Sequence, residues 1–410
     1  RSLGWWFRIA KHGVFYWPDT LEPTGDLCAM TAFGLYIHVP FCPQICPYCA
    51  FASVAGRGES HVPYAGAICR EIESWRHMPG TLHTVFFGGG TPSQVEPALV
   101  ERMLETARRQ FGLVSGAEIT IEVNPGTVDR ERFAQLKRLG FNRISIGAQA
   151  FVDADLRLLG RIHSADDVEQ AYLAARASGF DNVSFDLIAD MPGVSETHWR
   201  QSLERAIDLA PEHLSVYSLT IEEGTIFAAR KRDGRLASVP EDLQANTLQW
   251  TARRLIEAGY EHYEVSNYAR PGYRSRHNWG YWTGAAYLGV GLGAHSFIAG
   301  ERFWNTRDLD AYLAAGAAGQ SPRDGDEQID EDTARQERLW LGLRTIEGVA
   351  LAPGDIQRMQ SNPRFAELQK AGYSVLEDDR LRLTDAGFLL ADSLGLELER
   401  ILEDSEDAAA

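Results

Sequence analysis

Short apolar runs alternate with amphipathic stretches along the first half of the chain. Six runs rich in apolar residues occur between residues 35 and 219, and each of the first five is followed by a stretch with helical periodicity. Strands that alternate with helices at this spacing form parallel sheets with right-handed crossovers. The pattern therefore predicts an α/β protein with a partial (β/α)6 barrel of the TIM type. The expected strands are 35–39, 84–87, 118–123, 143–146, 183–188 and 213–219.

The second half of the chain follows a different pattern. A helix is expected at 242–258, followed by an aromatic, glycine-rich stretch at 260–297 and a polar linker at 318–332. A helix at 333–343, two strands that turn on residues 377–379 and a helix from Asp385 predict a small α+β domain of the winged-helix kind. The predicted divisions are an N-terminal extension (1–30), the barrel (31–230), the helical and aromatic segment (231–320), the C-terminal domain (321–400) and a disordered tail (401–410).

The composition is that of an ordinary globular protein. Of the 410 residues, 44% are hydrophobic and 24% are charged. The net charge of −17 argues against a nucleic-acid partner, because binding along a phosphate backbone needs a clustered basic face. The apolar runs are too short to predict a transmembrane segment, although weak association with a membrane stays open. Residues 1–30 begin with Arg1 and lack the apolar core of a secretory signal, so we expect an extension of unknown role, and whether it belongs to the native protein is open.

Three of the five cysteines lie close together, directly after the first expected strand. Cys42, Cys46 and Cys49 have the spacing C-x3-C-x2-C, which is typical of metal binding in a reducing compartment and predicts a cytoplasmic protein. A structural zinc site and an electron-transfer cluster both normally take four protein ligands. Three thiolates on a cubane cluster leave one iron open to another ligand. The alternative is a zinc site that His38 or His61 completes.

Polar and glycine-rich segments also follow later strands. Gly88, Gly89, Gly90 and Thr91 come directly after the second strand, where glycines let the backbone approach a ligand that side chains would block. Glu122 lies within an otherwise apolar strand, where a carboxylate is costly unless it is paired or liganded. In barrels of this type, catalytic and ligand-binding residues lie at the carboxyl ends of the strands. These segments predict a ligand site at that end of the barrel.

The motifs resemble those of the radical S-adenosylmethionine (SAM) superfamily, in which an aromatic residue, here Tyr48, precedes the last of three cysteines. The resemblance implies a radical SAM barrel with a [4Fe–4S] cluster on the three cysteines and SAM on the open iron. Electron transfer from such a cluster cleaves SAM to methionine and a 5′-deoxyadenosyl radical. Arg161 would bind the SAM carboxylate and Glu122 the ribose hydroxyls. The SAM-binding residues that the resemblance implies are Tyr36, Tyr48, Gly89, Gly90, Thr91, Glu122, Gln149, Arg161 and Asp186.

The resemblance narrows to the oxygen-independent coproporphyrinogen III oxidase family in its broad sense, over about residues 33–394. In the oxidases of this family a fourth cysteine stands two residues after the third, whereas Phe51 occupies that position here. A second branch, the haem chaperones, has three cysteines and an H-N-x-x-Y-W motif, which this chain carries from His277 to Trp282. The chain therefore looks like the haem chaperones. The segments that carry the family resemblance are 35–42, 88–93, 144–149, 185–188 and 337–344.

The resemblance implies a protein that carries haem as cargo and delivers it to acceptor proteins, with the cluster supporting transfer or formation of a homodimer. His277 is the candidate for haem contact, because neutral imidazole suits haem iron. The alternative for His277 is a hydrogen-bonded structural role, and His295 is a weaker candidate. Two enzymatic functions stay open: oxidative decarboxylation of coproporphyrinogen III to protoporphyrinogen IX, and another tetrapyrrole-directed radical SAM reaction. Phe51 makes the oxidase activity doubtful, and no catalytic residue is assigned.

Overall fold

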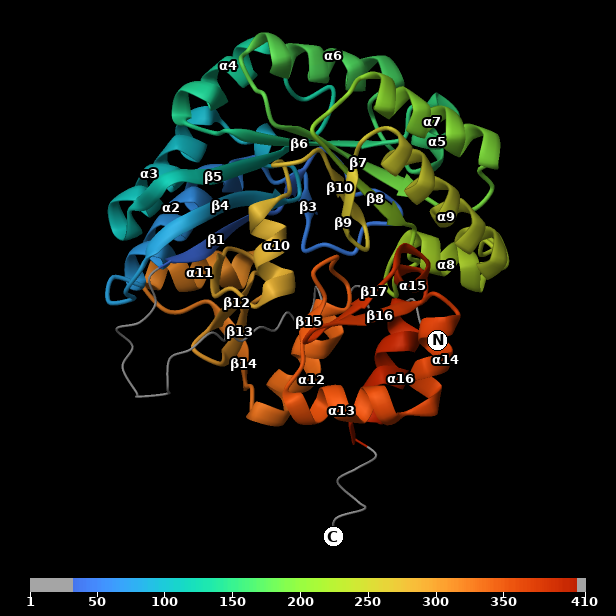
Figure 1. The fold of residues 1–410 in the computed structure, drawn as a ribbon. Helices are drawn as coiled ribbons and strands as arrows, with labels where there is room; N and C mark the ends of the chain where they lie inside the picture. Colours follow the sequence, from blue (N-terminus) through green and yellow to red (C-terminus); the bar gives the residue numbers. More distant parts are fainter. Residues whose placement is uncertain (1–31, 404–410) are drawn as a thin grey trace.

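Six parallel strands form the centre of the structure, a computed structural model that describes residues 32–403 (Figure 1). They belong to a twelve-stranded sheet with the order β14-β13-β12-β11-β1-β4-β5-β6-β7-β8-β10-β9. Every pair from β1 to β8 is parallel, which confirms the predicted partial barrel and its six strands. The six are β1 (Ala32–Val39), β4 (Thr81–Gly89), β5 (Leu113–Val123), β6 (Arg143–Gln149), β7 (Val183–Ala189) and β8 (His213–Ser218).

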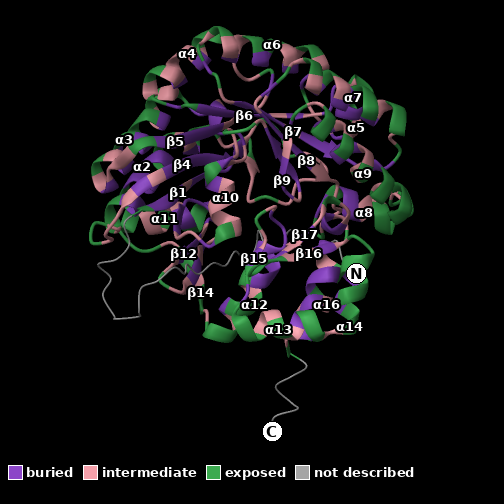
Figure 2. Ribbon diagram, in the orientation of Figure 1, coloured by how far each residue is buried: buried purple, intermediate pink, exposed green. Residues whose placement is uncertain are grey.

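Helices between these strands cover the outer face of the sheet (Figure 1). Their apolar sides pack on outward-facing strand residues such as Ile37, Phe87 and Ile121, and the strands are buried between the layers (Figure 2). Local signals define the helix ends: at the start of α4 the Asp129 carboxylate accepts a hydrogen bond of 2.8 Å from the Arg132 amide. The helices are α2 (His61–Ser74), α3 (Pro97–Phe111), α4 (Arg130–Leu139), α5 (Asp153–Leu158), α6 (Ala165–Ala177) and α7 (Glu196–Asp208).

The inner face of the sheet is polar. Successive side chains of a strand point to opposite faces, so the residues that alternate with the apolar ones face the inside of the barrel. The strand register places Glu122 beside Ser145, and Asp186 beside Ser215. Arg143, which is 1% exposed, shares this face at the start of β6. The barrel therefore encloses polar groups instead of a second apolar core.

Strands from the second half of the chain extend the barrel sheet at both edges. β11 pairs in parallel with β1, and β12, β13 and β14 follow in antiparallel order, while β10 and β9 continue the sheet beyond β8. The linker predicted at 318–332 is wrong in part, because β14 occupies Arg323–Gln328 and its exposed charged side chains resemble those of a loop. The added strands are β9 (Glu261–Glu264), β10 (Asn267–Ala269), β11 (Tyr287–Val290), β12 (His295–Ile298), β13 (Glu301–Asn305) and β14.

Four helices and a short strand pair complete the barrel unit. The strands β2 (Phe41–Cys42) and β3 (Val54–Ala55) pair with each other at the two ends of the cysteine segment. The helix predicted at 242–258 is confirmed as α9. Within residues 32–403, no helix combines the length and the apolar character that crossing a membrane requires. The helices are α8 (Ile226–Arg232), α9 (Glu241–Glu257), α10 (Arg276–Thr283) and α11 (Leu309–Ala318).

The C-terminal unit has its own apolar core, which includes Met359, Leu381 and Leu398, and it lies across the open side of the barrel (Figure 1). The predicted helix, strand pair and final helix are confirmed. The predicted tail at 401–410 is wrong at its start, because α16 continues to Glu403; residues 404–410 and the predicted extension 1–30 lie outside the described residues. The elements are α12 (Glu331–Gly342), β15 (Val349–Ala350), α13 (Pro353–Ser361), α14 (Pro363–Lys370), β16 (Ser374–Glu377), β17 (Arg380–Leu383), α15 (Asp385–Phe388) and α16 (Ala391–Glu403).

Candidate functional site

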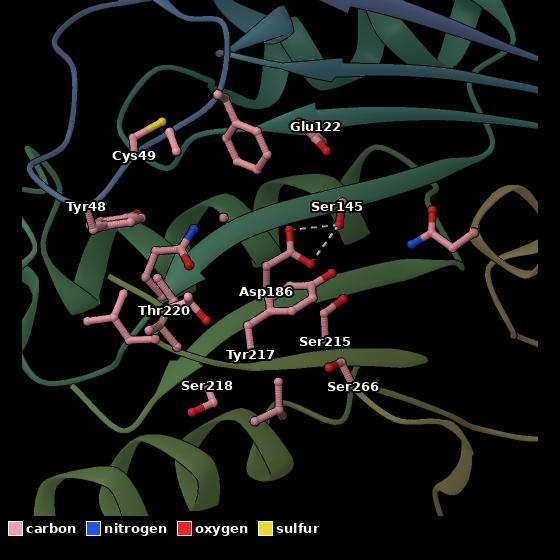
Figure 3. A pocket seen from close by; sticks show the side chains of 18 of the residues that line it. Tyr48, Cys49, Glu122, Ser145, Asp186, Ser215, Tyr217, Ser218, Thr220 and Ser266 are labelled. Atoms are coloured by element: carbon pink, nitrogen blue, oxygen red, sulfur yellow. Dashed lines mark hydrogen bonds between the residues drawn. The ribbon is translucent and has the colours of Figure 1, made fainter. Parts of the chain in front are cut away.

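A cavity of about 760 Å³ lies between the barrel and the C-terminal unit. Pockets that bury a small ligand typically measure about 300–1,000 Å³. Figure 3 shows Glu122, Asp186 and Tyr217 turned toward the same space. The weaker haem candidate, His295, does not line this cavity. The other residues that the sequence assigned to the metal, to SAM or to haem all line it, although they come from distant parts of the chain: Tyr36, Cys42, Cys46, Tyr48, Cys49, Gly89, Gly90, Thr91, Glu122, Gln149, Arg161, Asp186 and His277.

The cysteine loop, residues 42–53, forms one wall of the cavity. Its three cysteines are partly exposed, and two of their thiols accept hydrogen bonds from side chains elsewhere in the barrel. The Thr91 hydroxyl donates to Cys42 Sγ at 3.7 Å, and Arg161 Nη1 donates to Cys46 Sγ at 3.7 Å. Burial raises the pKa of the Cys42 and Cys49 thiols. Donors aimed at sulfur stabilise thiolates and influence the potential of an iron–sulfur cluster, so this surrounding fits cluster ligands.

The geometry of the loop differs from that of a single-ion site. Among residues 32–403, no three side chains of His, Cys, Asp or Glu converge closely enough to bind one metal ion. Thiolates of a cubane each bind a different iron, so they stand farther apart than the ligands of one zinc ion. The His38 imidazole, which the zinc alternative invokes, already hydrogen-bonds the Tyr36 hydroxyl through Nδ1 and the Ala52 carbonyl through Nε2, both at 3.0 Å. His38 would have to give up both hydrogen bonds to become a zinc ligand.

The glycine motif holds the end of β4 against the start of the cysteine loop. Gly89 has a φ of +113°, and a Cβ there would lie 2.4 Å from the His38 ring. A Cβ on Gly90 would lie 2.5 Å from the Pro40 carbonyl oxygen. The Gly90 amide instead donates to the Val39 carbonyl at 2.8 Å. Glycine is therefore needed at both positions for the close packing of β4 against the start of the cysteine loop.

Two carboxyl groups on the inner face of the barrel hold their protons unusually tightly. Glu122 accepts a hydrogen bond of 3.0 Å from the Gly89 amide, and the Ser145 hydroxyl donates to both oxygens of Asp186 at 3.1 and 3.0 Å (Figure 3). Burial, and secondly the nearby Asp186, raises the pKa of Glu122 to about 8. Burial also raises the pKa of Asp186. Near neutral pH the protonated Glu122 carboxyl can both donate to and accept from ligand hydroxyls.

Arg161 and Gln149 lie at the end of β6 beside the cysteine loop. Arg161 Nη2 donates to Asn124 Oδ1 at 2.6 Å and to the Gly147 carbonyl at 3.0 Å, which fixes the guanidinium, while its Nε is buried without a hydrogen bond. Gln149 has a φ of +65°, a left-handed conformation that is uncommon outside glycine and that collects at functional sites. The unpaired donor of Arg161 is suited to a ligand carboxylate.

The second aromatic residue assigned to SAM is Tyr48, which closes the loop against α8. Its ring packs beside Phe227 with 6.3 Å between the centroids, and the Phe227 amide donates to the Pro47 carbonyl at 3.0 Å. Burial raises the pKa of the Tyr48 hydroxyl, so this residue is a neutral aromatic wall of the cavity. The helix α8 thereby supports the cysteine loop from behind.

His277 on α10 is 3% exposed, and both of its ring nitrogens are hydrogen-bonded. Nδ1 lies 2.7 Å from the Thr84 hydroxyl, and Nε2 lies 2.8 Å from the Tyr281 hydroxyl. The ring stacks on Phe86 at 5.2 Å, and the His277 amide donates to Glu118 Oε1 at 3.1 Å. Burial lowers the pKa of His277 to about 3, so the imidazole is neutral. These contacts favour the structural alternative for His277 over haem contact.

Two parts of the cavity lining were not predicted, because no sequence motif contains them. The first is Arg143, whose only sequence signal is a charge alternating with apolar residues in the strand Arg143-Ile-Ser-Ile. The second is an apolar wall that three separate regions of the chain build. Its members are Leu248 and Ala252 of α9, Val265 and Tyr268 around β10, and Phe388, Leu389 and Leu390 of the C-terminal unit. This wall adds an apolar part to the cavity, although the same regions also contribute Gln244, Ser266 and Asp392 to its lining.

The fold and the site define a radical SAM protein, and comparison with known proteins agrees. The family description "Radical SAM superfamily" matches residues 36–206. Among solved structures, the chain resembles coproporphyrinogen III oxidase (HemN) from Escherichia coli, with a TM-score of 0.78 over 96% of this chain and 98% of that one. Because the two are 23% identical, this likeness shows the fold alone.

Comparison with curated proteins identifies the family within this superfamily. The "Heme chaperone HemW" of Synechocystis is 39% identical over 80% of this chain and 81% of that protein, and the one from Mycobacterium tuberculosis H37Rv is 36% identical over 88% and 93%. The mitochondrial "Radical S-adenosyl methionine domain-containing protein 1" of Mus musculus is 38% identical over 92% and 89%. The chain belongs to the HemW family of haem chaperones within the radical SAM superfamily.

Proposed function

We propose that this protein binds haem in the cavity, next to a SAM-liganded [4Fe–4S] cluster, and passes the haem to acceptor proteins. The observation that carries the proposal is that one cavity joins the cysteine loop to the apolar wall of the C-terminal unit. Polar groups at one end suit a cluster and SAM, while the apolar end suits a flat macrocycle. The HemW relatives, which are named as haem chaperones, support this assignment.

The residues present fit the cluster and SAM. Cys42, Cys46 and Cys49 would hold three irons, with thiols that face the cavity and receive donors from Thr91 and Arg161. When bound, the pair supplies one-electron reduction of the SAM sulfonium. The buried, unpaired Nε of Arg161 and the fixed guanidinium would orient the SAM carboxylate.

The remaining SAM contacts would come from the inner face and the glycine motif. Glu122, whose pKa burial raises to about 8, and Asp186, whose pKa burial also raises, would hydrogen-bond the ribose hydroxyls. Gly89 and Gly90 line the cavity beside the cysteine loop, and Tyr36, Tyr48 and Gln149 complete the walls. His277, whose nitrogens bond Thr84 and Tyr281, would hold α10 against the barrel.

Phe51 supports the chaperone over the oxidase. It occupies the position of the fourth cysteine that the oxidase branch carries, and its side chain, 55% exposed, lies on the cavity. Haem binding needs no such thiol. Decarboxylation of coproporphyrinogen III is therefore the outcome that would contradict the proposal.

One anaerobic experiment separates the two functions. The cluster is reconstituted, and the protein receives coproporphyrinogen III with SAM and a reductant in one arm and ferric haem in another. We expect stoichiometric haem binding by absorption titration, no protoporphyrinogen IX, and transfer of bound haem to an apo-acceptor protein. Formation of protoporphyrinogen IX, or failure to bind haem, would contradict the proposal.

The same proposal places the protein in the cytoplasm, where free thiols persist. A homodimer and weak membrane association are parts of the proposal that two measurements test. Light scattering with and without the cluster gives the oligomeric state. Flotation with vesicles of anionic phospholipid shows whether the protein binds a membrane surface.

A further inference from the structure

Two histidines among the described residues line the cavity, and they differ in their surroundings. His277 lies at the barrel end, with both nitrogens hydrogen-bonded. His262 lies on β9 at the apolar end and is 6% exposed. Its ring stacks on Tyr268 at 4.2 Å with 14° between the planes, and meets the edge of Phe388 at 5.1 Å. Aromatic contacts on two sides fix the orientation of the His262 ring.

The hydrogen bond of His262 determines which nitrogen carries the proton. Nδ1 lies 3.1 Å from Oδ1 of Asp385, the first residue of α15 in the C-terminal unit. An aspartate carboxylate at neutral pH has acceptor atoms only, so it accepts this hydrogen bond. Nδ1 is therefore the donor of this hydrogen bond, which leaves Nε2 as the ring nitrogen that is open to another partner. That Nε2 is buried and makes no hydrogen bond.

A buried ring nitrogen without a hydrogen-bond partner costs free energy. An imidazole that donates Nδ1–H to a carboxylate and keeps Nε2 free has the arrangement of a metal-ligating histidine. The carboxylate orients the ring and raises the basicity of Nε2. Leu248, Val265 and Leu389 surround this end of the cavity with apolar side chains. An apolar wall beside a metal-binding nitrogen suits a metal held in a flat macrocycle.

We propose that His262 Nε2 is an axial ligand of the haem iron and that Asp385 is its positioning residue. The assignment rests on the proposed haem binding and adds the ligand and the place of the macrocycle. Haem would lie at the joint between the barrel unit, which supplies His262, and the C-terminal unit, which supplies Asp385.

The test uses the full chain with its reconstituted cluster and ferric haem as the probe. His262→Gln keeps a donor toward Asp385 and removes the imidazole; we expect an altered Soret band, altered low-spin EPR signals and at least a tenfold loss of haem affinity. His262→Gly with added imidazole should recover the wild-type spectrum, which a purely structural role would not predict. Asp385→Asn should lower the Fe–imidazole stretching frequency in resonance Raman spectra of the ferrous form.

The matched control is His198→Ala. His198 has a similar partner, with Nδ1 at 3.0 Å from Asp155 Oδ1, but it lies on α7 outside the cavity lining. We expect wild-type haem spectra from this variant, and thermal unfolding and cluster absorption identify any variant that has lost its fold. A wild-type haem spectrum and affinity in His262→Gln would overturn the inference, as would loss of the axial ligand in His277→Ala alone. Failure of the wild-type protein to bind haem would instead contradict the proposed function.

Discussion

The two ends of the cavity are built on different principles. At the cysteine end, polar side chains come from consecutive barrel strands, and hydrogen bonds hold most of them, as with Arg161 on Asn124 and Ser145 on Asp186. At the other end, apolar side chains come from α9, β10 and the C-terminal unit, and His262 keeps one nitrogen free. In the proposed function the polar end binds SAM, and the apolar end binds the flat face of the macrocycle. Separate variants should therefore disable the two ends independently.

The largest expected effect is on the metal content of the cysteine end. Cys46→Ala removes one of three cluster ligands, so we expect loss of nearly all of the about four irons per chain of a [4Fe–4S] cluster. Haem affinity should change less than about twofold, because the apolar end is untouched. Iron analysis and absorption spectra after anaerobic reconstitution measure the cluster content. Titration with haem measures the haem affinity.

The matched control for this variant is Cys69→Ala. Cys69 is a buried thiol of α2 that accepts a hydrogen bond of 3.4 Å from Thr106 and does not line the cavity. The Cys69→Ala variant should keep its full iron content. A Cys46→Ala protein that retains a [4Fe–4S] spectrum would show that the three cysteines are not the ligand set.

A charge at the apolar end should weaken haem binding and leave SAM binding intact. Leu390 lines the cavity and is 42% exposed, so Leu390→Asp is compatible with folding and places a carboxylate beside the macrocycle. We expect at least about a tenfold loss of haem affinity, which corresponds to about 1.4 kcal/mol. Leu396→Asp is the control, since Leu396 is 46% exposed on α16 and outside the cavity. Equal losses in both variants would contradict an apolar haem site.

A smaller effect, on SAM affinity, is expected when the planar guanidinium of Arg161 is replaced. Arg161→Lys keeps the charge and removes the geometry that matches a carboxylate, so SAM affinity should fall about tenfold. Calorimetric titration of the reconstituted protein with SAM measures this loss. Arg157→Lys, at an exposed position of α5, should bind SAM normally. Unchanged SAM affinity in Arg161→Lys would remove Arg161 from the SAM site.

The most gradual expected effect is on the pH dependence of stability, because it is spread over several pH units. The pKa of Glu122 is raised in the folded state to about 8 from 4.5, so the folded protein binds this proton more tightly than the unfolded chain. The free energy of unfolding should therefore fall as pH rises from about 4.5 to 8, by at most about 1.4 kcal/mol per pH unit for one proton. Glu122→Gln should make this slope shallower in urea titrations, whereas Glu101→Gln, at an exposed site on α3, should not.

The sequence predicted the cysteine end far better than the apolar end. The six barrel strands and their helices have regular periodicity, and the residues of the cysteine end lie in short motifs directly after strands. The apolar wall combines Leu248, Val265 and Phe388 from remote regions, and each of these residues looks like ordinary core. The edge strand β14 was missed because its exposed charges resemble a loop.

The role of a single side chain was hardest to predict. His277 stands in a motif, yet its hydrogen bonds with Thr84 and Tyr281 depend on where α10 docks against β4. His262 stands in no motif, and its free nitrogen depends on Asp385, which is far away in the chain. Such partners are set by tertiary packing, and a sequence pattern does not contain them.

The polar inner face of the barrel also bears on the lifetime of the chain. Arg143, Glu122 and Asp186 replace the apolar side chains that would stabilise a filled barrel, so the empty interior contributes little to folding. A ligand present at about a hundred times its Kd adds about 2.7 kcal/mol to the free energy of unfolding. We therefore expect the chain without its proposed cofactors to be the species most exposed to proteases, and limited proteolysis with and without the reconstituted cluster measures the difference.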